Sequence, residues 1–127
     1  MFEHGGLAYI VPVHAYLCLN VITERKGRPG AVLIRALEPI KGLEILKNTA
    51  GEESIALLNG PGKLTRALKI TRELNGLDST KGKTLFLCYP EDQEKTDIFC
   101  GTRIGVKSGK NKRWRFYTRE KKFIRKR

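Results

Sequence analysis

Arg35 stands inside an otherwise apolar run, Ala31 to Leu37 (AVLIRAL), where its type and setting suggest chemistry. The β-branched and aliphatic neighbours predict a largely buried strand. A buried guanidinium is costly unless it is paired or serves a site. Glu38 or Glu44 could pair with it, and the alternative is an arginine that acts in an active site.

Asn20 is a second polar residue in an apolar setting, the stretch Cys18-Leu-Asn-Val21. An asparagine at such a place either satisfies backbone groups at the end of a strand or lines a pocket. The apolar surroundings of Cys18 predict a buried thiol that acts as a small hydrophobic side chain. Asn20 is therefore a candidate pocket residue, with a structural role as the alternative.

The three cysteines, Cys18, Cys88 and Cys100, are too scattered for a disulfide framework or a CxxC metal pair. His4 and His14 complete no zinc signature with them. We expect neither a metal nor another cofactor.

The run from 59 to 66 (NGPGKLTR) predicts the start of a helix. One of its first two residues caps the helix, and Pro61 lies in the first turn, where a missing N–H costs nothing. The free N–H groups there, with Lys63 and Arg66 nearby, could contact a phosphate. The alternative is a plain capped helix.

Residues 113–117 (RWRFY) alternate basic and aromatic side chains, as a strand would require. Arg113 and Arg115 share one face with Tyr117, and we expect this face to contact nucleic acid, unless it is merely solvated. Trp114 and Phe116 share the other face, and we expect both in the core.

Twenty-five Lys and Arg face 13 Asp and Glu, so the net charge is +12, and the excess concentrates from Lys107 onward. This imbalance favours a polyanionic partner, of which nucleic acid is the commonest. No apolar run reaches the ~18–20 residues that span a bilayer. Glu3 and His4 precede any apolar run, so we expect no signal peptide and a soluble intracellular protein.

The pattern of elements predicts an α+β fold, mostly of antiparallel strands. Residues 1–118 suit one domain with one core, and 119–127 form a basic tail expected to add salt-sensitive affinity for nucleic acid. Strands are expected at 7–13 and 16–23, as a hairpin with its tip near 12–14, and at 31–37, 84–89, 97–106 and 113–118. Short helices are expected at 42–48, 52–58 and from about 60, and turns at 75–76 and 109–112.

Four segments occur in order along the chain: Cys18-Leu-Asn-Val21, Ala31 to Pro39, Asn59-Gly-Pro-Gly-Lys-Leu64, and Arg103-Ile-Gly-Val106 followed by Trp114-Arg-Phe-Tyr117. Together they resemble the alkyladenine-type 3-methyladenine DNA glycosylases. The resemblance implies a protruding β-hairpin and a monomer that acts on duplex DNA, in the cytoplasm at the nucleoid of a prokaryote or in a eukaryotic nucleus. It implies base-excision repair, in which a damaged purine nucleotide is flipped out of the stack and activated water hydrolyses its N-glycosidic bond.

The resemblance assigns roles to several residues. Arg35 matches the arginine beside the catalytic water. Asn20 matches the asparagine bordering the base pocket, whose amide would clash with the 2-amino group of guanine, and Cys18 lies beside it. Val11 or Ile10 takes the place of a pocket tyrosine. The tip of the hairpin enters the DNA at a position that matches Val13, followed by His14.

The chain also departs from the family pattern. A segment of the type Glu-Ala-Tyr, which carries the general-base glutamate, has no counterpart here; Met1-Phe2 matches an internal Met-Phe, and Glu3 does not match the glutamate. The hairpin is about one residue shorter, and Val13 replaces a wedge tyrosine. His14 replaces a glycine, and a histidine would be strained if the tip needs a positive φ.

Two explanations remain open, a misassigned start or a truncated gene copy, and we expect these 127 residues alone to have weak or no activity. The first rival is a non-catalytic nucleic-acid-binding remnant. The second is an unrelated basic protein associated with ribosomes.

Overall fold

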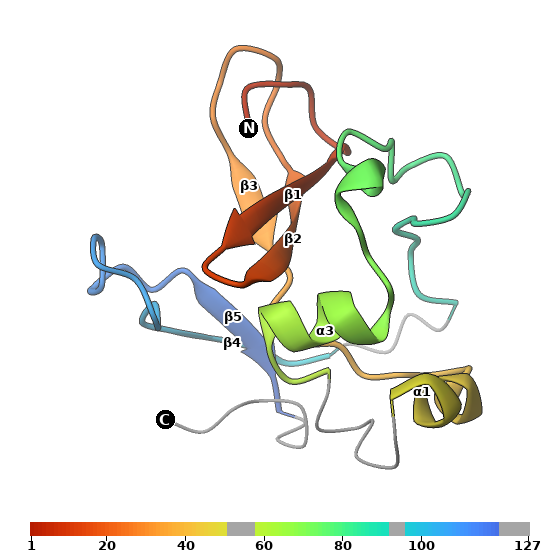
Figure 1. Cartoon of the computed structure of the whole chain (residues 1–127). Coiled ribbons are helices and arrows are strands. Elements are labelled where there is room, and N and C mark those ends of the chain that lie inside the picture. Colours follow the sequence, from red (N-terminus) through yellow and green to blue (C-terminus); the bar gives the residue numbers. More distant parts are fainter. Residues whose placement is uncertain (51–57, 92–95, 120–127) are drawn as a thin grey trace. The chain divides into compact units, whose positions relative to one another are not determined.

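The computed structural model describes residues 1–50, 58–91 and 96–119. The chain divides into two compact units, Met1–Tyr89 and Pro90–Arg127, and each is described by itself. Antiparallel strands and a few short helices confirm the α+β class (Figure 1).

The first unit is built on a three-stranded antiparallel sheet in the order β1-β2-β3. β1 (Ala8–Val13) and β2 (Tyr16–Ile22) form the predicted hairpin, and their register pairs Val13 with Tyr16 across the turn. β3 covers Ala31–Leu33 and is shorter than predicted. The next amide, of Ile34, still donates to the Leu19 carbonyl at 2.9 Å, but that of Leu37 donates to Leu58 instead. The chain therefore leaves the sheet toward the helical segment.

The outer edge of β1 is closed by a segment from much later in the chain. The Ala8 amide donates to the Leu77 carbonyl at 2.8 Å, and the Ile10 amide donates to Asn75 Oδ1 at 2.8 Å. The next outward position is Pro12, which has no N–H to satisfy. An exposed strand edge is thus avoided without a further strand.

The two α-helices described in the first unit begin within a residue of their predicted starts, whereas its 3₁₀ turn was not predicted. α1 spans Leu43–Ala50, α3 spans Pro61–Ala67 after the extended N-cap Gly60, and a 3₁₀ turn, η1, spans Arg72–Leu74. The helix expected at 52–58 lies outside the described residues, apart from Leu58. Two apolar clusters form the core: Ala8, Ile10, Leu19 and Ile70 on the sheet, and Leu58, Leu64 and Ala67 around α3, with Ile34 packing against both.

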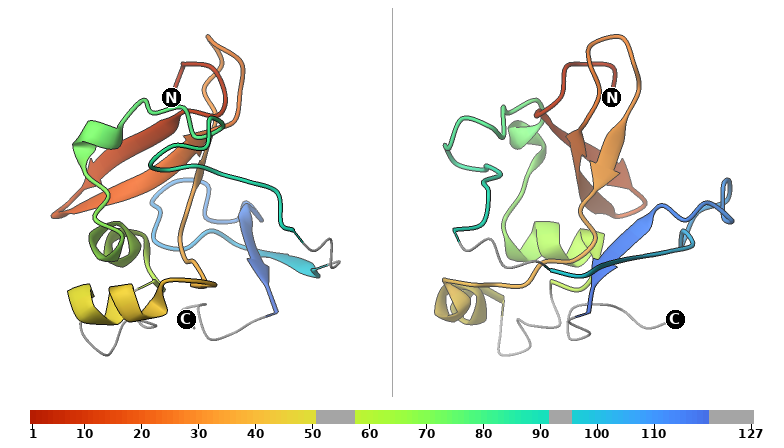
Figure 2. Two further views of the ribbon diagram at one scale, coloured as in Figure 1. Left: turned by 90° about the vertical axis from the view of Figure 1, so that its right-hand side faces the viewer. Right: turned by 180° about the vertical axis from the view of Figure 1, so that it is seen from behind.

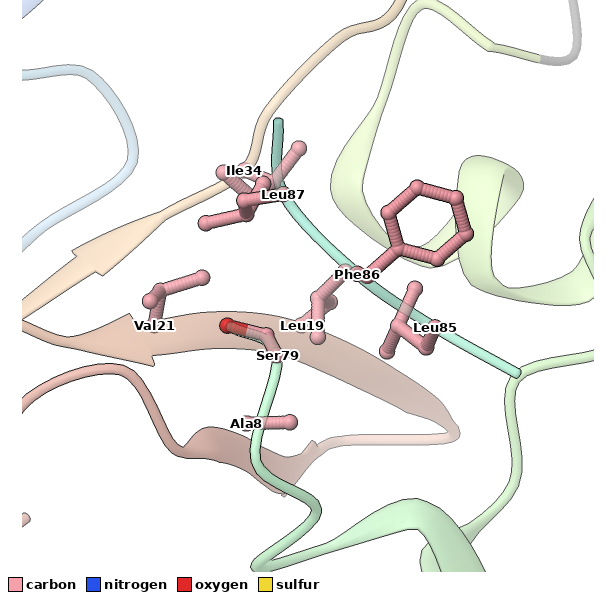
Figure 3. A pocket seen from close by; sticks show the side chains of 8 residues that line it. All are labelled: Ala8, Leu19, Val21, Ile34, Ser79, Leu85, Phe86 and Leu87. Atoms are coloured by element: carbon pink, nitrogen blue, oxygen red, sulfur yellow. The ribbon is translucent and has the colours of Figure 1, made fainter. Parts of the chain in front are cut away.

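The strand predicted at 84–89 does not form. Residues 79–89 run beside the sheet as an extended loop (Figure 2), and the Leu87 amide donates to Ser79 of the same loop. Leu85, Phe86 and Leu87 close an apolar cavity of about 20 Å³ over Leu19 and Ile34 (Figure 3). A space of this size belongs to the core, because it is far too small for a purine base.

The second unit contains one hairpin among its described residues. β4 (Ile98–Gly101) pairs antiparallel with β5 (Arg115–Thr118), within the two predicted strands but shorter than either. The predicted turn at 109–112 is confirmed by a hydrogen bond from the Lys112 amide to the Gly109 carbonyl. The core prediction for Trp114 and Phe116 is wrong, since these side chains are 63% and 67% exposed. A two-stranded sheet has no second layer of its own to bury them.

Candidate functional site

Several residues that the sequence predicted to line a pocket lie on one face of the three-stranded sheet. The register of the hairpin sets Val11 opposite Cys18 and Tyr9 opposite Asn20. Directly opposed residues of antiparallel strands share a face, so all four lie on one face. Ile10, the other candidate for the pocket position, points into the core on the opposite face.

Arg35 joins this face through the register of the third strand. Asn20 is paired with Leu33, and the hydrogen bond from Ile34 to Leu19 continues the same register. Arg35 therefore falls beside Cys18, and its positive charge acts on the Cys18 thiol. The structure thus brings together Val11, Cys18, Asn20 and Arg35, from three separate segments.

The Asn20 side chain has the backbone role that the sequence left as an alternative. Its amide nitrogen donates to the Tyr9 carbonyl at 3.1 Å and to the Cys18 carbonyl at 3.3 Å. These bonds orient the carboxamide on the sheet face. Asn20 is only partly buried, so it still presents a surface there.

Cys18 is a buried, neutral side chain. It is 8% exposed, and burial raises the pKa of its thiol, while the nearby Arg35 guanidinium lowers it to a smaller extent. A raised pKa disfavours the thiolate, which is the form that attacks or binds metal. Within the described residues, no three His, Cys, Asp or Glu side chains could together hold a metal ion.

The tip of the hairpin projects apolar and strained residues. His14 has a φ of 53°, in the left-handed region, where a side chain costs about 1–2 kcal/mol. This agrees with the strain expected there from the sequence. Val13 and Tyr16, on either side of the turn, are large exposed hydrophobic residues. An exposed apolar tip flanked by a tight turn is suited to insertion between other apolar groups.

Helix α3 is attached directly to this hairpin. The Thr65 hydroxyl donates to the Leu17 carbonyl of β2 at 2.8 Å. A Cβ on Gly62 would lie 2.7 Å from Tyr16 Cβ, so the helix approaches as closely as only glycine allows. As a result the Arg66 guanidinium lies 5.4 Å from the centre of the Tyr16 ring.

A shallow groove of about 140 Å³ runs between the tip and the helix. Its lining includes Ala15, Tyr16, Gly62, Thr65 and Arg66. The sequence pointed to Arg66 and to close approach at the glycines of 59–66, but Tyr16 and Thr65 were missed. Their signals are weak, because a tyrosine at a strand start or a threonine in a helix looks ordinary until the partner segment is known.

Lys63 lies exposed on α3, between the Gly62 and Arg66 positions just described. Its side chain runs back toward Gly60, whose position for a Cβ is 3.8 Å from Lys63 Cδ. Lys63 and Arg66 thus add positive charge to the helix that is attached to the hairpin.

In the second unit, Arg113 and Arg115 brace the β4–β5 hairpin. Arg113 donates to the Cys100 carbonyl at 3.1 Å, and Arg115 donates through Nε to the Thr102 carbonyl at 3.0 Å. Gly101 leaves room for this, because a Cβ there would lie 2.7 Å from a terminal nitrogen of Arg115. Both guanidinium groups are thus held by backbone carbonyls in β4 or in the residue that follows it.

The comparisons with known proteins match the order of the motifs. A family model described as methylpurine-DNA glycosylase matches residues 1–122. The chain belongs to the methylpurine-DNA glycosylase family. The match confirms the resemblance drawn from the sequence and extends across both compact units.

Curated members of this family share a third to nearly half of the residues of the chain. Relatives from Carboxydothermus hydrogenoformans, Chlorobium phaeobacteroides and Clostridium novyi are 44%, 42% and 36% identical over 99%, 98% and 99% of the chain. Each carries the name "Putative 3-methyladenine DNA glycosylase". The chain spans 67%, 63% and 68% of their lengths, about two thirds. None of the helices described here is long and apolar enough to cross a membrane.

Proposed function

We propose that this methylpurine-DNA glycosylase chain forms part of a base-excision repair enzyme that hydrolyses the N-glycosidic bond of alkylated purines in duplex DNA. The observation that carries the proposal is the gathering of Val11, Cys18, Asn20 and Arg35 on one sheet face, beside a hairpin whose tip is apolar. The target bond lies inside the duplex, so an enzyme that reaches it must extrude the nucleotide and fill the gap.

In this proposal the sheet face receives the flipped base. Val11 supplies apolar contact, Cys18 a neutral thiol surface, and Asn20 a carboxamide held in place by two backbone hydrogen bonds. The amide of Asn20 would disfavour guanine by a clash with its 2-amino group. Arg35 holds the water that attacks the sugar carbon while the bond to the base breaks; the proton that the water loses goes to the departing base, or to bulk water where the alkylated base is cationic and leaves as a neutral molecule.

The hairpin tip and α3 would form the DNA-facing edge of the first unit. Val13 is the wedge, His14 lies at the turn, and Lys63 and Arg66 contact phosphates on either side of the gap. The stacking of Arg66 on Tyr16 supports this role, because it holds the guanidinium close to the wedge.

Arg113 and Arg115 of the second unit would add phosphate contacts, as would the basic tail that begins at 119, of which 120–127 lie outside the described residues. We propose that the protein acts as a monomer on double-stranded DNA with a damaged purine, in the cytoplasm where the nucleoid lies.

A second candidate is a non-catalytic nucleic-acid-binding protein. Two observations favour it: the wedge residue is the small Val13, and the Asn20 amide is already occupied by the backbone. In this reading the cationic surfaces keep their partner, while base release is lost.

A base-excision assay beside a binding assay separates the two candidates. The chain is incubated with duplex DNA that contains one alkylated purine, and released base and bound DNA are measured separately. Release that disappears in Arg35→Ala, with binding near that of the unchanged chain, supports the glycosylase. Arg28→Ala, which removes an exposed arginine from a turn, is the matched control and should leave both readouts unchanged. Binding without release selects the second candidate, and absence of both contradicts each.

A further inference from the structure

The segment from Ile98 to Arg119 carries positive charges only. It contains seven basic residues and no Asp or Glu; the basic residues are Arg103, Lys107, Lys110, Lys112, Arg113, Arg115 and Arg119. We call this segment, which comprises β4, β5 and their connection, the cation–aromatic hairpin. Charge of this density attracts a polyanion, and it falls on an element that also exposes aromatic rings.

Among the aromatic rings of this hairpin that pair with a cation, that of Trp114 is the most exposed to solvent. Arg103 lies 5.8 Å and Lys112 4.9 Å from the ring centroid, yet the residue remains 63% exposed. Two residues later, within β5, Phe116 is 67% exposed.

A second group of rings and cations lies along the two strands. The rings of Phe99 and Tyr117, paired across β4 and β5, have centroids 6.0 Å apart with planes inclined by 25°. Arg115 lies 4.8 Å from the Tyr117 centroid, and Arg119 lies 5.8 Å from that of Phe99. Cations therefore lie over three rings of the hairpin, those of Phe99, Trp114 and Tyr117.

Cation–π pairs by themselves would only stabilise the hairpin modestly, since exposed pairs contribute about 0.5–1 kcal/mol each. They do not account for Trp114 and Phe116, which keep most of their surface in water. Flat rings set among cations fit a ligand that presents flat apolar faces along an anionic backbone. Unpaired nucleobases in a single strand do so, whereas the bases of a duplex are stacked on one another.

We propose that the cation–aromatic hairpin binds single-stranded DNA, with bases stacked on Trp114 and on the neighbouring rings of β5 and with phosphates held by the flanking Arg and Lys side chains. This binding is independent of the proposed excision activity, because it requires neither a damaged base nor a duplex.

The test uses the fluorescence of the whole chain, since Trp114 is its only tryptophan. The probe is a short oligothymidylate, which contains no purine and cannot pair with itself. The control ligand is a strand of the same length and charge made of abasic nucleotides. Stacking predicts that oligothymidylate quenches the emission of Trp114 and that the abasic strand does not. Equal quenching by both strands, or quenching by neither, overturns the proposal.

Variants then test the ring rather than the charge. Trp114→Ala should weaken oligothymidylate binding about tenfold, measured by anisotropy of a labelled strand, as expected for loss of one stacked base. Phe2→Ala, which removes a ring that is 60% exposed in the first unit, should leave the affinity unchanged. Both residues are largely exposed, so neither change empties a core. An equal loss in both variants, or a loss of duplex binding in Trp114→Ala as large as its loss of single-strand binding, would refute the assignment.

Discussion

The Arg66 guanidinium lies 5.4 Å from the centre of the Tyr16 ring, although the two residues belong to a helix and to a strand fifty positions earlier. The contact exists because Thr65 bonds the Leu17 carbonyl and Gly62 lets the helix touch Tyr16. The hairpin and Arg66 of α3 are therefore held together, and a ligand that contacted the tip of the hairpin would lie close to Arg66 as well.

Replacing Arg66 should consequently weaken DNA binding and its dependence on salt together. If Arg66 contacts a phosphate as proposed, Arg66→Ala removes that contact, and the slope of log affinity against log salt should become shallower by about 0.9 for duplex DNA. Titrations at several salt concentrations measure this slope. Arg72→Ala removes the same charge from the exposed η1 and should change the slope less. Equal effects in both variants would mean that only the total charge matters.

Adding a side chain at Gly62 in α3 should cost more than adding one at Gly60, the N-cap of the same helix. Gly62→Ala places a Cβ 2.7 Å from Tyr16 Cβ, so the helix or the hairpin must shift, and overpacking of this kind costs about 1–3 kcal/mol. The free energy of unfolding in urea measures the cost. In Gly60→Ala the nearest atom is 3.8 Å away, on the flexible Lys63 side chain, and a change at this N-cap should stay within about 1 kcal/mol. A Gly62→Ala protein as stable as Gly60→Ala would show that the close approach is not required.

Removing the backbone strain at His14, at the tip of the hairpin, should stabilise the chain. His14 has a φ of 53°, and glycine takes this conformation without a steric penalty, so His14→Gly should raise the free energy of unfolding by up to about 1 kcal/mol. Ala15→Gly, at the next residue, which has no positive φ, should lower it by about 0.5–1 kcal/mol. Thermal and urea unfolding of the two variants decide the sign, and destabilisation by both would argue against strain at His14.

Cys18 should make the stability of the chain decrease at alkaline pH. The folded-state pKa of its thiol is raised above the ordinary 9.0, mainly by burial. The stabilising contribution is complete below that ordinary value and is lost as the pH rises through the higher folded-state pKa, because the unfolded thiol ionises first. Urea unfolding of the unchanged chain and of Cys18→Ala, compared from neutral to alkaline pH, isolates this contribution. A pH-independent difference between the two proteins would contradict it.

The same thiol reports on Arg35. The guanidinium lowers the pKa of Cys18, so Arg35→Ala should raise that pKa further and slow alkylation of the thiol at a given pH. The measurement needs Cys88→Ser and Cys100→Ser in the background, because those two cysteines are exposed. An unchanged alkylation rate would separate Arg35 from Cys18 and remove one support for the common sheet face.

The sequence alone determined the features whose causes are local. The charge of +12 is a property of composition. The β1–β2 hairpin follows from alternating residues around a tight turn, and the start of α3 follows from Pro61 after an extended Gly60, because a helix satisfies its hydrogen bonds within a few residues. The family could also be recognised, because its motifs are short and contiguous.

Only the tertiary structure decided which distant segments meet. Residues 84–89 have the composition of a strand but no ladder partner, so they form a loop, and Trp114 and Phe116 remain exposed because no second layer covers a two-stranded sheet. Asn20 and Arg35 were nominated separately, and the sheet register brought them to one face. A strand takes its hydrogen bonds and a side chain takes its burial from residues far along the chain, which no local pattern identifies.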